Sequence, residues 1–276
     1  MNIRLLALDM DGTVLRSDGT VSGRTRDVLK KAAARGALVV PATGRVVKML
    51  PEPVRSIPGV RYAVTANGGS LWDLKDSSAL YTNPMPTRDA DFIIRLFASY
   101  GLMVEAYCGG VSYSDRKEFR LLRRFPLPDR ILRFILRSQQ FVEDLPGYLA
   151  ARGLSVEKIN VPFLPPALRP EILKRLKGMR PYTVTSSGFV NLEINAASCS
   201  KGKALRHLCR KLGVAPAQVM AFGDADNDVT MLRFAGFGVA MANAEPAARQ
   251  AADFVTASND EDGVAAAVER FVFSGG

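Results

Sequence analysis

The chain has 276 residues, of which 47% are hydrophobic and 23% charged, and it carries a formal net charge of +10. This length allows one large core or two domains, and because the sequence has no run of 18 apolar residues we expect no membrane-spanning helix. The first strand that we expect begins close to Met1, which leaves no room for a signal peptide, so we expect a cytoplasmic protein. The cysteines lack metal-site spacing and are expected to be reduced thiols.

The positive net charge favours anionic partners such as phosphorylated metabolites or nucleic acids. The densest basic stretch spans residues 116–137, where arginine and lysine are interleaved with apolar side chains. We interpret this stretch as an amphipathic helical region with a solvated basic face, because no recognisable RNA- or DNA-binding module accompanies it. We therefore expect neither a nucleic-acid nor a membrane partner, and the oligomeric state is left open.

In chain order, the first predicted element is a buried strand over residues 5–8 that runs into Asp9-Met10-Asp11-Gly12-Thr13. Asp9 and Asp11 are two residues apart, so a continued strand pleat would place both side chains on one face. Two carboxylates this close need a shared cation or a shared proton at neutral pH. The stretch therefore indicates a metal site, or an acid and a base with separated pKa values, and a simple surface turn is the alternative.

The next elements repeat this pattern of strands that end in polar groups. A helix over residues 23–35 leads to a buried strand over 37–42, which ends in Thr43-Gly44-Arg45, and a third strand is expected over 62–66. The alternation of strands and helices predicts an α/β fold with a doubly wound parallel sheet. In such sheets the chemistry lies at the carboxyl ends of the strands.

A second α/β unit of about 100 residues interrupts this pattern and is long enough to fold as a module. We predict a core domain over residues 1–84, an inserted cap domain over 85–188, and the rest of the core over 189–276. Within the cap we expect a helix over 139–152. The core is expected to resume with a strand over 189–194.

Four polar clusters follow one another along the chain. They are Asp9-x-Asp11-Gly12-Thr13, Thr43-Gly44-Arg45, Lys201 at a predicted helix start, and Gly223-Asp224-x-x-Asn227-Asp228 after a predicted buried strand. In this order they resemble the four motifs of the haloacid dehalogenase (HAD) superfamily. Five short matches resemble its Cof-type subfamily in particular: Thr43-Gly44-Arg45, Asn67-Gly68-Gly69, Ser200-Lys201-Gly202, Asn243-Ala244 and Glu261-Asp262-Gly263.

The resemblance implies a Rossmann-like core with a class IIB α/β cap inserted after the third strand. It also implies a Mg²⁺-dependent phosphatase that acts on small phosphorylated metabolites, which are mostly sugar phosphates in this subfamily. A phosphomutase on the same fold stays open, because transfer instead of hydrolysis needs a second bound hydroxyl. A basic nucleic-acid-binding protein on a retired catalytic scaffold is a third alternative, which the intact catalytic positions disfavour.

The residues suit hydrolysis of a phosphate monoester, which needs an in-line nucleophile, charge neutralisation and a proton for the leaving alcohol. Asp9 can attack phosphorus to form an aspartyl-phosphate, and Asp11 can protonate the leaving oxygen and later activate water. Asp224 supplies a carboxylate for Mg²⁺ beside Asp9, and Lys201 a point charge for phosphate oxygens. The resemblance assigns the same roles. It adds the Asp11 backbone carbonyl as a metal ligand, and Asp228 as the residue that holds a metal-bound water or orients Lys201.

The remaining site residues are expected to contact substrate. Thr43 offers a hydroxyl, Gly44 a backbone N–H and Asn227 an amide for phosphate oxygens, whereas Arg45 either contacts substrate or forms a structural ion pair. Asp226 is interpreted as an acid at a helix N-terminus with no role in the site. Substrate choice would come from the cap, where we expect candidates on its strands: Glu105, Tyr107, Tyr113, Lys158 and Asn160.

Overall fold

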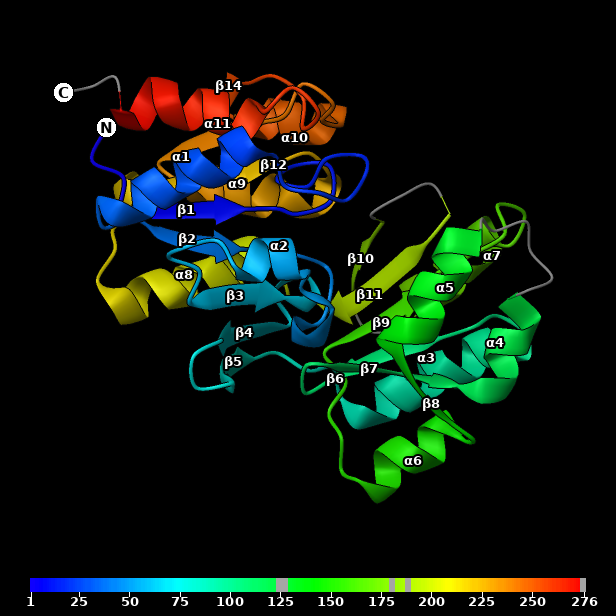
Figure 1. Cartoon of the computed structure of the whole chain (residues 1–276). Helices are drawn as coiled ribbons and strands as arrows, with labels where there is room; N and C mark the ends of the chain where they lie inside the picture. The colour runs from blue at the N-terminus through cyan, green and yellow to red at the C-terminus, as the bar shows by residue number, and fades with distance from the viewer. Residues whose placement is uncertain (123–128, 179–181, 187–189, 274–276) are drawn as a thin grey trace. The chain divides into compact units, whose positions relative to one another are not determined.

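The computed structural model describes residues 1–122, 129–178, 182–186 and 190–273 (Figure 1). Contacts divide the chain into two compact units. Unit 1 contains Met1–Arg45, Leu50–Tyr81 and Ser200–Gly276, and unit 2 contains Val46–Met49 and Thr82–Cys199. Within the described ranges, no helix combines the length and the apolar character needed to cross a bilayer.

The core of unit 1 is a five-stranded parallel sheet with the order β14-β13-β12-β1-β2. Its strands are β1 (Leu5–Leu8), β2 (Leu38–Pro41), β12 (Val219–Gly223), β13 (Phe237–Ala240) and β14 (Phe254–Val255). β1 and β12 are apolar and buried along their whole length, as expected of parallel strands covered on both faces. β1 has β2 on one side and β12 on the other, so the sheet has a switch point between β1 and β12. The predicted α/β fold is confirmed.

The third predicted strand extends this sheet on the side of β2. β3 (Tyr62–Thr65) follows Val60, which forms an isolated parallel bridge with Val39, and its Val64 forms a second bridge with Ala42. β3 then pairs antiparallel with β4 (Ser70–Asp73), and β5 (Ser78–Thr82) completes a three-stranded sheet. The carboxyl end of β3 therefore lies beside the segment that follows β2.

Two helices of unit 1, α1 and α8, each begin after a serine whose hydroxyl caps the helix. The Ser22 hydroxyl accepts from the Thr25 N–H at the start of α1, and the Ser200 hydroxyl accepts from the Lys203 N–H at the start of α8. α8 ends at Gly213, whose φ of +62° is in the left-handed region. The α-helices are α1 (Gly23–Ala34), α2 (Glu52–Arg55), α8 (Lys201–Leu212), α9 (Val229–Phe234), α10 (Pro246–Ala251) and α11 (Gly263–Val268).

Unit 2 is built on a six-stranded sheet with the order β10-β11-β9-β6-β7-β8, in which only β7 and β8 pair in parallel. The strands are β6 (Glu105–Cys108), β7 (Val111–Asp115), β8 (Gln139–Val142), β9 (Lys158–Val161), β10 (Tyr182–Thr185) and β11 (Leu192–Ala196). The helices are α3 (Thr87–Ser99), α4 (Arg116–Leu122), α5 (Asp129–Ser138), α6 (Leu145–Ala151) and α7 (Arg169–Lys177). Alternate strand residues such as Ala106, Ile159 and Ile194 pack in one apolar core with Ile93 and Phe97 of α3.

Two expectations for this region are corrected. The strand that we assigned to the resumed core is β11, which pairs with β9 and β10 and so lies in unit 2 through Cys199. The predicted boundary at residues 188 and 189 itself falls outside the described residues. The expected helix over 139–152 begins only at Leu145, because its first four residues form strand β8 beside β7.

The basic stretch over residues 116–137 contains α4 and α5, as the amphipathic pattern predicts. Residues 123–128, which include Arg123 and Arg124, lie outside the described part of the chain. Arg116 forms an ion pair with Glu143, and Lys117 forms one with Asp115. Some of the basic side chains are therefore paired within unit 2.

Candidate active site

The site lies at the carboxyl ends of β1 and β12, where the switch point of the parallel sheet predicts it. Asp9 follows β1 and its N–H donates to the Phe222 carbonyl of β12 at 3.0 Å, while Asp224 follows the end of β12. Gly12 turns the chain away with a φ of +85°, and a Cβ there would lie 2.4 Å from an Asp224 oxygen. Only glycine lets these two segments approach so closely.

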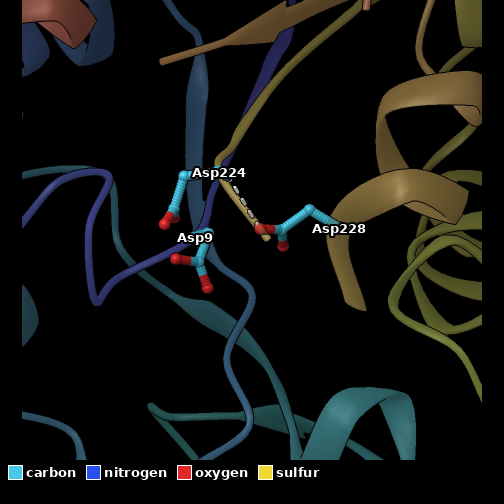
Figure 2. A group of neighbouring side chains, drawn as sticks. All are labelled: Asp9, Asp224 and Asp228. Atoms are coloured by element: carbon cyan, nitrogen blue, oxygen red, sulfur yellow. Dashed lines mark hydrogen bonds between the residues drawn. The ribbon is translucent and has the colours of Figure 1, made fainter. Parts of the chain in front are cut away.

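Three carboxylates meet at this point. One oxygen from each of Asp9, Asp224 and Asp228 lies within 4.8 Å of the others (Figure 2). Asp228 is fully buried, and its Oδ2 accepts the backbone N–H groups of Asp224 at 3.0 Å and Ala225 at 3.1 Å. The Thr13 hydroxyl donates to Asp224 Oδ1 at 2.8 Å. The three carboxylates are thus held in place by neighbouring groups.

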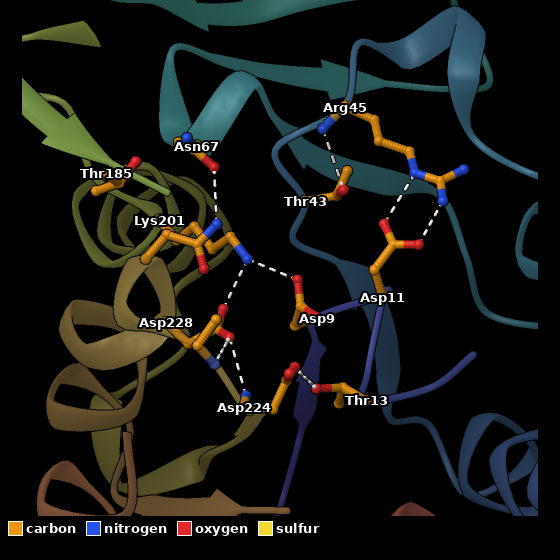
Figure 3. A network of polar contacts seen from close by, with 12 residues as sticks. Asp9, Asp11, Thr13, Thr43, Arg45, Asn67, Thr185, Lys201, Asp224 and Asp228 are labelled. Carbon is orange, nitrogen blue, oxygen red and sulfur yellow. Dashed lines mark hydrogen bonds and ion pairs between the residues drawn. The ribbon is translucent and has the colours of Figure 1, made fainter. Parts of the chain in front are cut away.

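Lys201, the first residue of α8, brings a positive charge into this cluster. Its buried ammonium donates to Asp9 Oδ1 and to Asp228 Oδ1, both at 2.6 Å, although Lys201 and Asp9 are 192 positions apart (Figure 3). Three negative charges and one positive charge leave the ionised cluster at −2. Such a deficit in a buried place calls for protons or for a cation.

The pKa values of these groups reflect the deficit. Burial, and next the charge of Asp228, raise the pKa of Asp9 well above its ordinary value, although Lys201 opposes this. The same two causes raise the pKa of Asp224 to about 6. Burial lowers the pKa of Lys201, but the charges of Asp228 and Asp9 outweigh it and raise the pKa overall. Lys201 therefore stays charged, and the carboxylates are the groups that would take up protons.

Asp11 does not join the three buried carboxylates. Its side chain is 58% exposed and turns to Arg45, which donates to it from Nε at 2.9 Å and from Nη2 (Figure 3). For Arg45 we left open a substrate contact or a structural ion pair, and the structure shows an ion pair with Asp11. Asp11 is thus beside the cluster, with its carboxylate open to solvent on one side.

The segments after β2 and β3 supply neutral groups. Thr43 is buried, and its hydroxyl accepts the Arg45 N–H at 3.1 Å. The Asn227 amide donates to the Asn67 Oδ1 at 3.1 Å. Asn67 has a left-handed φ of +57°, which asparagine tolerates better than most residues. Thr43 and Asn227 are therefore fixed in unit 1, as is the half-buried Gly44.

Sequence reasoning gave no role to three of the residues that support this site. The Thr13 hydroxyl donates to Asp224, and Asn67 accepts from the Asn227 amide. The Asn243 amide donates to the Gly12 carbonyl at 2.8 Å. The Asn67-Gly68 pair after a strand predicts a turn at this position, but it does not predict which residue the Asn67 side chain contacts. A Cβ on Gly68 would lie 2.1 Å from the Ser200 carbonyl oxygen, so this turn abuts the start of α8.

In unit 2, four of the five predicted specificity residues share one face of the sheet. The Asn160 amide donates to Glu105 at 2.7 Å, the Tyr107 hydroxyl donates to Glu105 at 3.2 Å, and Lys158 forms a buried ion pair at 2.7 Å with Glu193. Burial raises the pKa of Glu105. The fifth residue, Tyr113, belongs to the apolar core on the other face. Glu193, which we did not predict, completes the polar face.

Known proteins share this whole architecture. The family model of haloacid dehalogenase-like hydrolases matches residues 6–268. The 5-amino-6-(5-phospho-D-ribitylamino)uracil phosphatase YcsE of Bacillus subtilis is 29% identical over 99% of this chain and 97% of its own. The putative phosphatase YxeH of the same organism is 31% identical over 98% of this chain and 99% of its own.

Solved structures agree with these relatives. A haloacid dehalogenase-like hydrolase from B. subtilis superimposes with a TM-score of 0.82 at 27% identity, covering 98% of this chain and 100% of its own. A phosphatase of the same superfamily from Bacteroides thetaiotaomicron gives a TM-score of 0.80 at 26% identity, covering 98% and 95%. The chain therefore belongs to the haloacid dehalogenase-like hydrolases, in their Cof-type branch, and is a phosphoric monoester hydrolase.

Proposed function

We propose that the protein is a Mg²⁺-dependent phosphatase that hydrolyses small phosphorylated metabolites, with sugar or sugar-alcohol phosphates as substrates, through an aspartyl-phosphate on Asp9. The observation that carries the proposal is the convergence of Asp9, Asp224 and Asp228 around Lys201 at the carboxyl edge of the sheet. These residues come from segments on both sides of the insertion. Such a convergence serves phosphoryl transfer, which depends on positioning and charge neutralisation.

The donor set fits Mg²⁺. Magnesium prefers oxygen ligands, takes few of them from protein and keeps several waters. Asp9, Asp224 and the Asp11 carbonyl would hold the ion, with Asp228 acting through a water. The bound ion would balance the charge of −2 on the ionised cluster and would act as a Lewis acid that polarises the substrate phosphate. The Thr13 hydroxyl fixes the Asp224 carboxylate in advance.

Asp9 is the nucleophile in this proposal. Its Oδ1 accepts from Lys201, so the other oxygen is the one that attacks phosphorus. A bond from this oxygen to phosphorus forms while the bond to the leaving alcohol breaks. Lys201, which stays charged, holds the carboxylate in one orientation throughout.

Asp11 is the general acid and then the general base. Its carboxyl gives a proton to the leaving oxygen and afterwards accepts one from the water that hydrolyses the aspartyl-phosphate. Arg45 donates to both Asp11 oxygens, so Asp11 serves as the acid only after this pair opens and one of these oxygens takes up a proton. Thr43, Gly44 and Asn227 would donate hydrogen bonds to the phosphate oxygens.

The substrate class rests on the relatives and on the cap. Three B. subtilis relatives bear the name 5-amino-6-(5-phospho-D-ribitylamino)uracil phosphatase. The compound in this name carries a phosphorylated sugar-alcohol chain. The polar face of unit 2, with Glu105, Lys158, Asn160 and Glu193, offers donors and acceptors of the kind that hydroxyl groups require. We infer that it selects the alcohol part of the substrate.

A phosphate-release screen tests the proposal. Purified protein is incubated with p-nitrophenyl phosphate and a panel of sugar and sugar-alcohol phosphates, with Mg²⁺ or with EDTA. We expect turnover only with metal, and none in Asp9→Asn. The control is Asp226→Asn, an exposed acid of the same loop, which should keep wild-type activity. Equal rates with EDTA or in Asp9→Asn would overturn the mechanism, and an isomerised phosphate ester without free phosphate would indicate a mutase.

A further inference from the structure

A hollow of about 760 Å³ lies in unit 1 between the end of α8, the loop that follows it and the end of α9. Its volume is in the range of small-molecule sites, about 300–1,000 Å³. The lining includes Arg206 and Arg210 of α8, Arg233 of α9, and the apolar side chains of Val214 and Phe234. The lining of the hollow therefore combines basic and apolar side chains.

The charges in this hollow have one sign. Three guanidinium groups line it, and no acidic side chain does so among the described residues. Arg206 and Arg210 are four residues apart on one helix, an arrangement of like charges that destabilises a helix unless an anion compensates it. A concave wall with charges of one sign concentrates counter-ions. The pKa of the neighbouring His207 is lowered, first by burial and then by the positive charges of Arg210 and Lys203.

The hollow also contains an aromatic ring in contact with a guanidinium group. The Arg206 guanidinium lies over the Phe234 ring with its carbon 5.3 Å from the ring centroid, which is a cation–π contact. Val214 and Cys209, which also line the hollow, are buried. Stacked arginine and aromatic faces are surfaces on which planar heterocycles bind well, while the outer guanidinium groups suit phosphates.

The hollow is separate from the proposed active site. It adjoins the loop that enters β12, whereas Asp224 follows the other end of that strand. The five residues of β12 span about 16 Å at about 3.3 Å per residue. Both places are connected by α8, which begins with Lys201 and carries Arg206 and Arg210 toward its other end.

We propose that this hollow is a second ligand site, which binds an organic phosphate of the nucleotide class, with the phosphates at Arg210 and Arg233 and the planar group on Phe234 and Arg206. The negative charge of the ligand compensates the guanidinium groups. The planar group covers apolar side chains of the lining. The same helix α8 carries both this site and Lys201, whose ammonium contacts the proposed nucleophile Asp9.

ADP is the probe, because it is not a phosphate monoester of the kind that the active site hydrolyses. Its affinity is measured by isothermal titration calorimetry with EDTA present, for the whole chain. We expect a single site in the wild type, and an affinity at least tenfold lower in Arg210→Gln/Arg233→Gln. The matched control, Arg26→Gln/Arg55→Gln, removes two exposed arginines of the same unit outside the hollow and should bind ADP within twofold of the wild type.

Three further measurements separate this site from others. Thr43→Val, a change in the proposed phosphate site, should leave ADP affinity unchanged, and inorganic phosphate should bind at least tenfold more weakly than ADP. Arg210→Gln/Arg233→Gln should keep its turnover of p-nitrophenyl phosphate within twofold, which shows that it is folded, and Arg210→Glu alone should also lose ADP. ADP binding that depends on Thr43 but not on Arg210 and Arg233 would overturn the proposal. So would equal affinity for phosphate, no ADP binding up to 5 mM, or capture of an RNA oligonucleotide in place of ADP.

Discussion

Removal of the Lys201 ammonium is the sharpest test of how the acidic cluster is held together. In Lys201→Met the buried carboxylates of Asp9 and Asp228 lose their shared partner, whose contacts are both 2.6 Å. Breaking a buried ion pair by removing one partner costs about 3–5 kcal/mol. At about 2–4 °C per kcal/mol, we expect the metal-free variant to unfold about 10 °C below the wild type at pH 8.

The loss should depend on pH. Burial raises the pKa of Asp9, so the protonated form stabilises the fold at low pH and this contribution disappears as pH rises through the folded pKa. Without the positive charge of Lys201, the stability of the fold depends more strongly on protonation of Asp9. The difference in Tm between Lys201→Met and the wild type should therefore shrink from pH 8 to pH 5.

The assay is thermal unfolding followed by circular dichroism with EDTA at both pH values. The control is Lys203→Met, which removes a half-buried lysine two residues further along α8 and should change stability by less than about 0.5 kcal/mol. Equal losses in the two variants, or a loss in Lys201→Met that does not change with pH, would refute the account of a charge-deficient cluster.

Three other outcomes are expected. Burial raises the pKa of Asp224 to about 6, so its protonated form stabilises the metal-free fold until the pH rises through 6. The rise in Tm on adding MgCl₂ should therefore be larger at pH 7.5 than at pH 5. Equal rises at the two pH values would contradict a metal at Asp224. Gly12→Ala should abolish this Mg²⁺ effect, whereas Gly19→Ala, at a similar φ of +83° but with no atom within 4 Å of the new Cβ, should keep it. In Asp11→Asn, kcat should fall by about 10²–10⁴ for a sugar phosphate and by much less for p-nitrophenyl phosphate, whose leaving group needs little protonation; parallel losses for both substrates would rule out Asp11 as the acid.

The sequence was informative wherever a local pattern determines structure. Apolar runs before Asp9 and Gly223 predict buried parallel strands, and polar groups directly after them predict where side chains gather. The helix start at Ser200-Lys201 follows from capping chemistry, and the structure shows that cap. The fold class and the position of the site at the strand ends could therefore be stated from residues alone.

Contacts between strands and side chains far apart in the chain could not be predicted from the sequence. The alternation in Leu192–Ala196 predicts a strand, but either sheet could have received it, and only pairing with β9 decides. The contact between Glu193 and Lys158 follows from that register. In the same way, the Asn227 amide after β12 donates to Asn67 in the turn after β3, although the two residues are 160 positions apart. These relations depend on packing between segments far apart in the chain.

The position of β1 between β2 and β12 has a consequence for biosynthesis. β1 is translated before unit 2, but its neighbour β12 begins at Val219, after the whole of unit 2 has been translated. At about 5–20 residues per second the ribosome needs roughly 10–40 s to bridge that interval. During this time one edge of β1 has no native partner and is open to wrong pairing. The insertion thus delays the meeting of Asp9 and Asp224 and exposes the nascent chain to misfolding before the enzyme can form.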